Sequence, residues 1–367
     1  MSATIAKTVS GPRVTTGATL KLRGGHDPVA LQTASQELED QGYTVVKNVL
    51  SFEKAAEYKE RLLQWLEDFQ LGFRRDDPET WKWEYLPESW KGGLYTKYGI
   101  GHEQFAWDLR TEQALIDVFA YIWGTDELLV SFGKSPFPIP LYNLSMEADS
   151  IPLSDGSNIS LPMPASERAK VEKEYQPWPH TDQSLTRTYK HCIQGLVNLA
   201  PNGPEDGGLM VLHGSAALFS EFVKANEHDK PEEGWSPIDI HLHTPSQLEW
   251  YLSKGCSWRK IDAGPGDVVL WDSRCLHMGV APGVGGGLRA GFEDVCYKPA
   301  KLITPEKLAL KQDFARRYAQ TSHDPVEVRE TTAGVGWRIR KPGERIEPLI
   351  KTILTKRARQ LAGLKAY

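Results

Sequence analysis

The feature that most constrains the fold is a run of short β segments between His180 and Tyr297, separated by turns rich in glycine and proline. The segments lie at 192–199, 208–212, 267–271 and 289–297, and one helix, at about 215–225, interrupts them. Many short strands with turn signals between them are typical of a sandwich, a jelly roll or a barrel. We therefore expect one of these three architectures at the centre of the chain.

The sequence on either side of this region is predicted to be mainly helical. Apolar residues recur at three- and four-residue steps from Val29 and stop at Gly42, and Ser51 is a suitable N-cap for a helix that runs to about Phe69. Further helices are expected at 111–123, 308–318 and 347–361, and strands at 43–49, 128–132 and 139–144.

These patterns predict a flexible N-terminal arm over 1–28 and one domain over 29–367. The domain divides into a helical part at 29–125, a β core at about 126–300 and C-terminal helices at 301–367. The charged, Ser- and Pro-rich stretch 147–176 is interpreted as an insertion in a loop. The aromatic stretch 72–101 is interpreted as a long ordered loop, either a lid over a pocket or a segment packed against the scaffold.

Composition narrows the possible partners. The formal net charge of the 367 residues is −5 and there is no long basic run, so a nucleic-acid partner is not expected. No signal peptide and no apolar run long enough to cross a bilayer is present, which favours a cytoplasmic protein with no membrane partner. The four cysteines are widely spaced and fit reduced thiols. A monomer and a homodimer both remain open.

A candidate metal site begins at Pro179-His180-Thr181-Asp182. On extended backbone His180 and Asp182 share one face, because successive side chains alternate between faces. A third ligand is available from His277, which ends the stretch 266–277. Two histidines and one carboxylate with open positions beside them form the metal site of non-haem Fe(II) oxygenases. With ten histidines in the chain, the His-x-Asp pattern alone is weak evidence, and its surroundings decide its weight.

Three further features stand in a fixed order around this set. The stretch 207–215 (GGLMVLHGS) follows it, Gly266-Asp267 opens the strand that ends at His277, and Arg289 lies twelve residues beyond His277. With the opening stretch 42–50, these residues resemble the phytanoyl-CoA dioxygenase-like (PhyH) family of Fe(II)/2-oxoglutarate oxygenases, over roughly 42–297. The family often has Pro-Gly-Ser-His where this chain has His-Gly-Ser-Ala at 213–216. This departure affects contacts near the turn and leaves the ligands untouched.

The resemblance implies a mainly β fold with flanking helices, a double-stranded β-helix or distorted jelly roll of the cupin kind. It implies that His180, Asp182 and His277 bind Fe(II), and that Arg289 pairs with the distal carboxylate of the cosubstrate 2-oxoglutarate, with O2 as the second cosubstrate. Charge supports the last assignment. Fe(II) with two neutral histidines and one aspartate keeps one positive charge, and the 2-oxoglutarate dianion turns this into one negative charge. A buried distal carboxylate then needs a cation, and arginine offers a planar fork for it.

Other residues are weaker candidates. Gln194 shares a strand face with Leu196 and Asn198, and it serves either as a contact to 2-oxoglutarate or as a structural amide. His241 and His243 lack an acidic partner in a comparable β context, and strand alternation points Arg274 away from the side of His277. Residues that would shape a substrate pocket are Tyr142, Trp178, Gln183 and Arg187.

The sequence therefore predicts a dioxygenase that hydroxylates, desaturates or cyclises a small-molecule metabolite, such as an amino acid or an intermediate of secondary metabolism. One alternative is a cupin-like metal enzyme that does not use 2-oxoglutarate, for which Arg289 would be unnecessary. The other is a non-catalytic binding member of the fold, against which the intact ligand set argues. The sequence does not identify the substrate.

Overall fold

The computed structural model describes residues 22–89, 93–95, 98–133, 157–162, 165–169, 177–280, 287–292, 295–329, 345 and 347–367. Its helices are α1 (Pro28–Gln41), α2 (Phe52–Glu67), α3 (Gln104–Arg110), α4 (Gln113–Trp123), α5 (Ala165–Ala169), α6 (Ser215–Ala225), α7 (Pro245–Ser253), α8 (Pro305–Arg316) and α9 (Lys356–Leu361). Short 3-10 helices are η1 (Pro78–Thr80), η2 (Trp83–Tyr85), η3 (Ile100–His102), η5 (Glu227–Asp229) and η6 (Ala300–Leu302).

The strands form two larger antiparallel sheets and one small one. They are β1 (Tyr43–Val46), β2 (Leu94–Tyr95), β3 (Leu128–Val130), β4 (Ser157–Ser160), β5 (His180–Thr181), β6 (Ile193–Asn198), β7 (Gly208–His213), β8 (His241–Leu242), β9 (Ser257–Lys260), β10 (Val268–Asp272), β11 (His277–Val280), β12 (Arg289–Phe292) and β13 (Tyr297–Pro299). The six-stranded sheet has the order β1-β10-β6-β12-β4-β2, the five-stranded sheet β8-β5-β11-β7-β9, and the third pairs β13 with β3.

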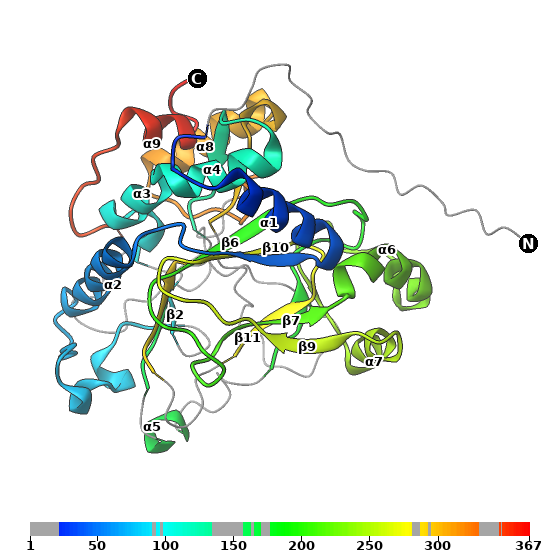
Figure 1. Ribbon diagram of the computed structural model, residues 1–367, viewed down its shortest axis with the longest axis horizontal. Helices are drawn as coiled ribbons and strands as arrows, with labels where there is room; N and C mark the ends of the chain where they lie inside the picture. Colours follow the sequence, from blue (N-terminus) through cyan, green and yellow to red (C-terminus); the bar gives the residue numbers. More distant parts are fainter. Residues whose placement is uncertain are drawn as a thin grey trace, which may run out of the picture.

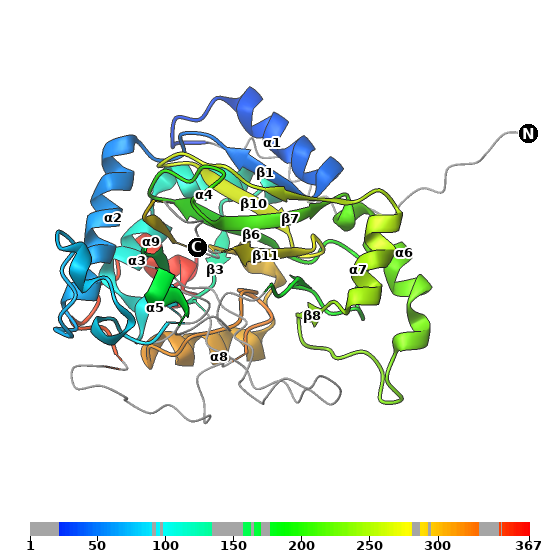
Figure 2. The same cartoon turned by 90° about the horizontal axis from the view of Figure 1, so that it is seen from below.

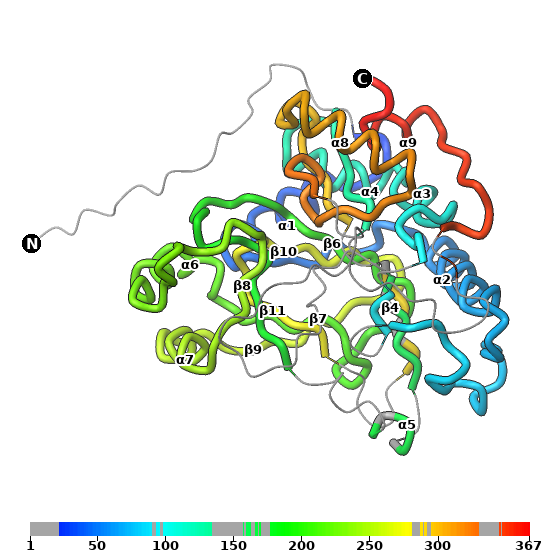
Figure 3. The backbone as a smooth tube through the Cα atoms, turned by 180° about the vertical axis from the view of Figure 1, so that it is seen from behind, coloured from blue at the N-terminus to red at the C-terminus, as the bar shows by residue number. Residues whose placement is uncertain are grey.

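The two larger sheets face each other, and helices cover them on the outside. Helices α1, α3, α4, α8 and α9 gather on the side of β6 and β10, whereas α6 and α7 lie together at the end of the five-stranded sheet (Figures 1, 2 and 3). The chain crosses from one sheet to the other between β6 and β7 and again between β10 and β11. This confirms the predicted mainly β fold with flanking helices, and it has the sheet arrangement of a distorted jelly roll.

Strand alternation divides the core in two along β10. Val268 and Leu270 pack into the large cluster beneath the helices, whereas Val269 and Trp271 pack into a smaller cluster with Leu209. Because Leu209 belongs to β7 of the facing sheet, Val269 and Trp271 lie between the sheets. The inner faces of β6 and β10 therefore border the space that the two sheets enclose.

Most of the predicted helices are confirmed, and two differences concern α7 and the C-terminal helix. Helix α7 was not predicted, although Thr244 and Gln247 form a complete capping box at its start. The helix expected over 347–361 forms only as α9, from Lys356. Ile350 and Ile353 are 73% and 79% exposed, so no buried face stabilises a helix at these positions.

Two loop interpretations also change. The stretch 147–176, interpreted as an insertion, contains β4, which pairs with β12 and β2 and so belongs to the six-stranded sheet. In the aromatic stretch 72–101, Tyr95 and Tyr98 are buried against Trp65 of α2. For these two residues the structure supports packing against the scaffold. The strand expected at 139–144 lies outside the described residues.

The chain is attached to the domain before α1 begins. The backbone amides of Arg23 and Gly24 donate hydrogen bonds to Asp117 of α4, and His26 bonds to the carbonyl of Ala114. The rest of the expected arm, 1–21, lies outside the described residues. All four cysteines are buried, and no disulfide joins them, which agrees with the predicted reduced thiols. Among the described residues, no helix is both long and apolar enough to cross a bilayer.

Candidate metal centre

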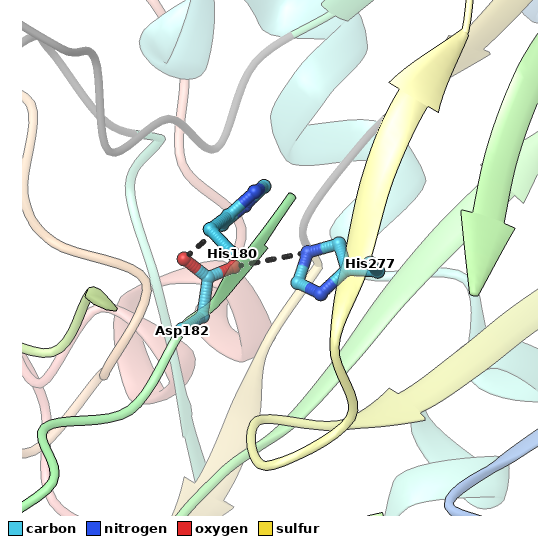
Figure 4. A group of neighbouring side chains, drawn as sticks. All are labelled: His180, Asp182 and His277. Atoms are coloured by element: carbon cyan, nitrogen blue, oxygen red, sulfur yellow. Dashed lines mark ion pairs between the residues drawn. The ribbon is translucent and has the colours of Figure 1, made fainter. Parts of the chain in front are cut away.

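The three predicted ligands meet at one buried point. His180 lies on β5, Asp182 follows that strand, and His277 opens β11 (Figure 4). Nε2 of His180 is 3.7 Å from Oδ1 of Asp182, and Nε2 of His277 is 3.4 Å from Oδ2. One ligand atom of each residue lies within 4.8 Å of the others. In the described part of the chain, this is the one group of three or more His, Cys, Asp or Glu residues arranged in this way.

Both histidines are oriented by a backbone carbonyl two residues earlier. Nδ1 of His180 lies 3.0 Å from the carbonyl oxygen of Trp178, and Nδ1 of His277 lies 2.9 Å from that of Cys275. A carbonyl oxygen only accepts, so each Nδ1 carries the proton and donates it. Each Nε2 then presents a lone pair towards the Asp182 carboxylate, which is the tautomer that a metal-binding histidine requires.

Trp178 supports His180 a second time, through its side chain. The indole and imidazole rings are stacked, with centroids 4.0 Å apart and an interplanar angle of 13°. Trp178 was predicted to shape a substrate pocket, and the structure places it directly beside a ligand. The carbonyl and the ring of this one residue together restrict the imidazole of His180.

The six-stranded sheet reaches across to the other two ligands. Gln194 of β6 donates from Nε2 to Oδ2 of Asp182 at 2.8 Å, and the ring of Trp271 of β10 lies 5.5 Å from that of His277. Gln194 was predicted as a cofactor contact or a structural amide, and the contact observed is to a ligand carboxylate. Trp271 was not among the predicted site residues; it shares a strand face with Val269, and both lie between the sheets.

Two of the other residues predicted to shape the substrate pocket, Gln183 and Arg187, form hydrogen bonds within the protein. The amide of Gln183 donates to the carbonyls of Arg187 and Tyr189 and accepts from Ser273. Arg187 pairs with Asp239 at 2.9 Å. These polar groups therefore support the loop after Asp182. Tyr142 lies outside the described residues.

Arg289 is placed by its backbone. It opens β12, in which Ala290 packs into the cluster beneath the helices and Gly291 pairs with Asn198 of β6. Positions 289 and 291 therefore belong to the other face of the sheet, the face that Asn198 shares with Gln194. The register is consistent with a role between the sheets.

Three weaker candidates from the sequence, Arg274, His241 and His243, have other partners in the structure. Arg274 forms a bidentate pair with Asp272, with N–O distances of 3.0 and 2.7 Å. His241 bonds to Gln247, and His243 lies 3.4 Å from the hydroxyl of Thr181, whose side chain alternates with that of His180. Burial lowers the pKa of His243 well below its ordinary value, so this histidine is neutral.

The donor set suits a divalent first-row metal. It offers two neutral imidazole nitrogens and one carboxylate, all buried, and it supplies only three ligands. Two imidazoles and one carboxylate suit Fe(II), Mn(II) or Zn(II), and three ligands leave positions open for substrates or water. The residues present therefore fit the predicted metal.

Comparison with known proteins agrees with this site. The sequence profile of the phytanoyl-CoA dioxygenase (PhyH) family matches residues 153–281, which include all three ligands. A protein of Aspergillus versicolor, "Ava biosynthesis cluster protein O", is 33% identical over 295 residues, covering 79% of this chain and 84% of the relative. The chain belongs to the PhyH family.

The PhyH fold extends to a distant solved structure. The crystal structure of GlcNAc Inducible Gene 2 (GIG2, DUF1479) from Candida albicans superposes with a TM-score of 0.56 at 12% identity, covering 92% of this chain and 77% of that one. At this identity the likeness concerns the fold alone. The superposition covers more of this chain than residues 153–281, which the family profile matches.

Proposed function

We propose that this PhyH-family protein is a non-haem Fe(II)- and 2-oxoglutarate-dependent oxygenase. The observation that carries the proposal is the buried His180–Asp182–His277 group, in which backbone carbonyls direct both Nε2 atoms at one point. Bound Fe(II), 2-oxoglutarate and O2 would supply an oxidant able to take hydrogen from an unactivated C–H bond. The protein's share is to bind, to orient and to exclude water.

Individual residues have separate tasks in this proposal. His180, Asp182 and His277 hold the metal, and Trp178 keeps the His180 ring in place. Arg289 pairs with the distal carboxylate of 2-oxoglutarate, which the charge argument and the register of β12 support. The ligands are at most 4% exposed, so the charged groups interact in a medium from which bulk water is largely excluded.

The substrate class follows from the relative and from charge. The Aspergillus relative is named for a biosynthesis cluster, and the sequence, with a net charge of −5, has no long basic run of the kind that binds nucleic acid. We propose a small metabolite as substrate, an amino acid or a natural-product intermediate. Hydroxylation is the default outcome, and desaturation or cyclisation can arise from the same hydrogen removal.

The test measures conversion of 2-oxoglutarate to succinate. Apoprotein is loaded anaerobically with Fe(II) and 2-oxoglutarate, exposed to O2, and screened with metabolites for those that stimulate succinate release. Arg289→Ala should reduce succinate formation at limiting 2-oxoglutarate, whereas Arg259→Ala, which removes an exposed arginine on β9, should leave it unchanged. Metal-dependent turnover that is indifferent to Arg289 and to 2-oxoglutarate would favour the cupin-like alternative, and metal binding with no turnover would favour a non-catalytic role.

A further inference from the structure

Two buried polar atoms beside the metal ligands have no hydrogen-bond partner among the described residues. One is the amide oxygen Oε1 of Gln194, and the other is the indole nitrogen Nε1 of Trp271. Gln194 is 0% exposed and Trp271 is 3% exposed. A buried donor or acceptor left unpaired costs about 1–3 kcal/mol, so such atoms are usually matched by a ligand or a water.

The two atoms face the same space. Gln194 and Trp271 are direct register partners on β6 and β10, so their side chains leave the same face of the six-stranded sheet. Gln194 donates a hydrogen bond to the carboxylate of Asp182, and the ring of Trp271 packs near the ring of His277. Both of these metal ligands come from the five-stranded sheet or the residue that follows its strand β5. The pair therefore lies between the sheets, at the end where the metal ligands are.

The orientation of the Gln194 amide is fixed by chemistry. An ionised carboxylate only accepts hydrogen bonds, so the NH2 group of Gln194 must face Asp182 and the oxygen must face away. That oxygen repels the carboxylate oxygens of a dianion and can be satisfied only by an O–H or N–H group. The indole N–H of Trp271 has the opposite preference, because it only donates.

We propose that Gln194 and Trp271 divide the supporting work at this site. Gln194 is the positioning residue that holds the metal ligand Asp182, and its oxygen keeps anionic oxygens away from its side of the metal. Trp271 donates its N–H to a carboxylate or oxo oxygen of 2-oxoglutarate. This role of Trp271 rests on the proposed function, whereas the role of Gln194 rests on metal binding alone. Together the residues fix the side on which the cosubstrate binds.

The experiment separates the two roles by measuring two affinities. Mn(II), which resists oxidation by air, replaces Fe(II), and free Mn(II) is counted by electron paramagnetic resonance. The affinity for 2-oxoglutarate is then measured by calorimetry at saturating Mn(II). Gln194→Met keeps the length of the side chain and removes both polar groups. Trp271→Phe keeps an aromatic ring against His277 and removes the N–H.

A crossed pattern is expected. Gln194→Met should weaken Mn(II) binding by about 10- to 100-fold, the usual effect of losing a partner that orients a ligand. Its affinity for 2-oxoglutarate at saturating metal should stay within about threefold of wild type. Trp271→Phe should weaken 2-oxoglutarate binding by about 10- to 100-fold, the equivalent of one hydrogen bond to a charged group, with Mn(II) binding within about threefold of wild type.

Matched controls remove similar groups from residues whose contacts lie with His241 and Asp229 and not with the ligands. Gln247→Met replaces a buried glutamine that bonds to His241 and Asp229, and Trp235→Phe removes another buried, unpartnered indole N–H. Neither should change either affinity. If Gln194→Met does not fold, as judged by near-ultraviolet circular dichroism, Gln194→Asn keeps an amide that is too short to reach Asp182 and should show the same loss of Mn(II) affinity.

The remaining outcomes overturn the proposal. It fails if both variants weaken both affinities to the same degree, if neither variant changes either, or if the controls reproduce the effects. A wild-type protein that binds Mn(II) and does not bind 2-oxoglutarate contradicts the proposed function and the role of Trp271. In that case the Mn(II) measurement on Gln194→Met still decides the role of Gln194.

Discussion

His180 and His277 are direct register partners of β5 and β11, and their ring centroids lie 4.3 Å apart. The pairing of two strands far apart in the sequence thus brings two imidazoles to the same face of one sheet. Asp182 joins them because it follows His180 by two residues. Strand pairing therefore builds the metal site, and each ligand depends on the register of the five-stranded sheet.

Removing the carboxylate ligand should abolish tight metal binding. We expect Asp182→Ala to lower the affinity for Mn(II) by roughly 100-fold or more, because losing a ligand exceeds the 10- to 100-fold effect of losing a supporting partner. Titration monitored by electron paramagnetic resonance measures it. Asp262→Ala, which removes a carboxylate that is 53% exposed, is the control and should bind Mn(II) like wild type. Equal affinities for wild type and Asp182→Ala would show that the metal binds elsewhere.

The stacked ring of Trp178 should matter for metal binding even though its carbonyl remains after substitution. Trp178→Ala should lower Mn(II) affinity severalfold, because the His180 ring loses the surface against which it is held. Trp178→Phe keeps a flat ring and should recover most of the affinity. The two variants are compared in the same titration. Indistinguishable affinities for the alanine and phenylalanine variants would mean that the backbone carbonyl alone orients His180.

A buried ion pair outside the metal site should control stability. Lys298 lies 2.7 Å from Asp324, which also pairs with His191, and both members of the Lys298–Asp324 pair are nearly inaccessible. We expect Lys298→Met to lower the free energy of unfolding by about 3–5 kcal/mol, because it leaves a buried carboxylate without its main partner. Urea denaturation measures it. Lys254→Met breaks an exposed pair with Glu221 and should change stability by less than about 1 kcal/mol.

The same pair predicts a dependence on acid. Burial alone would raise the pKa of Asp324, but Lys298 and His191 hold it well below its ordinary value. The pair's contribution is therefore complete above about pH 4, where the unfolded carboxyl ionises, and is lost as the pH falls towards the lower folded pKa. Asp324→Asn should be less stable than wild type at neutral pH, and the difference should shrink on acidification. A constant difference between pH 7 and pH 3 would contradict this assignment.

His102 should make the protein less stable in mild acid. Burial lowers the pKa of His102 to about 3, and its ring bonds to the carbonyl of Ala319. Between about pH 6.5 and pH 3 this histidine is protonated in the unfolded chain and neutral in the folded protein. The free energy of unfolding should therefore fall by up to about 1.4 kcal/mol per pH unit from this residue. Urea denaturation at several pH values should give a shallower slope for His102→Gln, and identical slopes would refute the prediction.

Local signals predicted much of the fold. Helices such as α1 and α2 follow from apolar periodicity, with Asp27 or Ser51 accepting a backbone hydrogen bond at the start, and these signals act within one or two turns. The helix predicted over 347–361 forms only from Lys356, because Ile350 and Ile353 find no surface to pack on, whereas Leu361 is buried. Helix α7 also has a local signal, because the capping box of Thr244 and Gln247 can be recognised in the sequence.

The sequence by itself determined the chemistry of the site. His180, Asp182 and His277 carry that information in residue type and order, and the family resemblance they support is confirmed. Only the tertiary structure decided which side chains hold these ligands. Gln194 and Trp271 become neighbours because β6 pairs with β10, and they reach Asp182 and His277 because the two sheets face each other. Such contacts depend on pairing and packing between distant segments, which local sequence patterns do not encode.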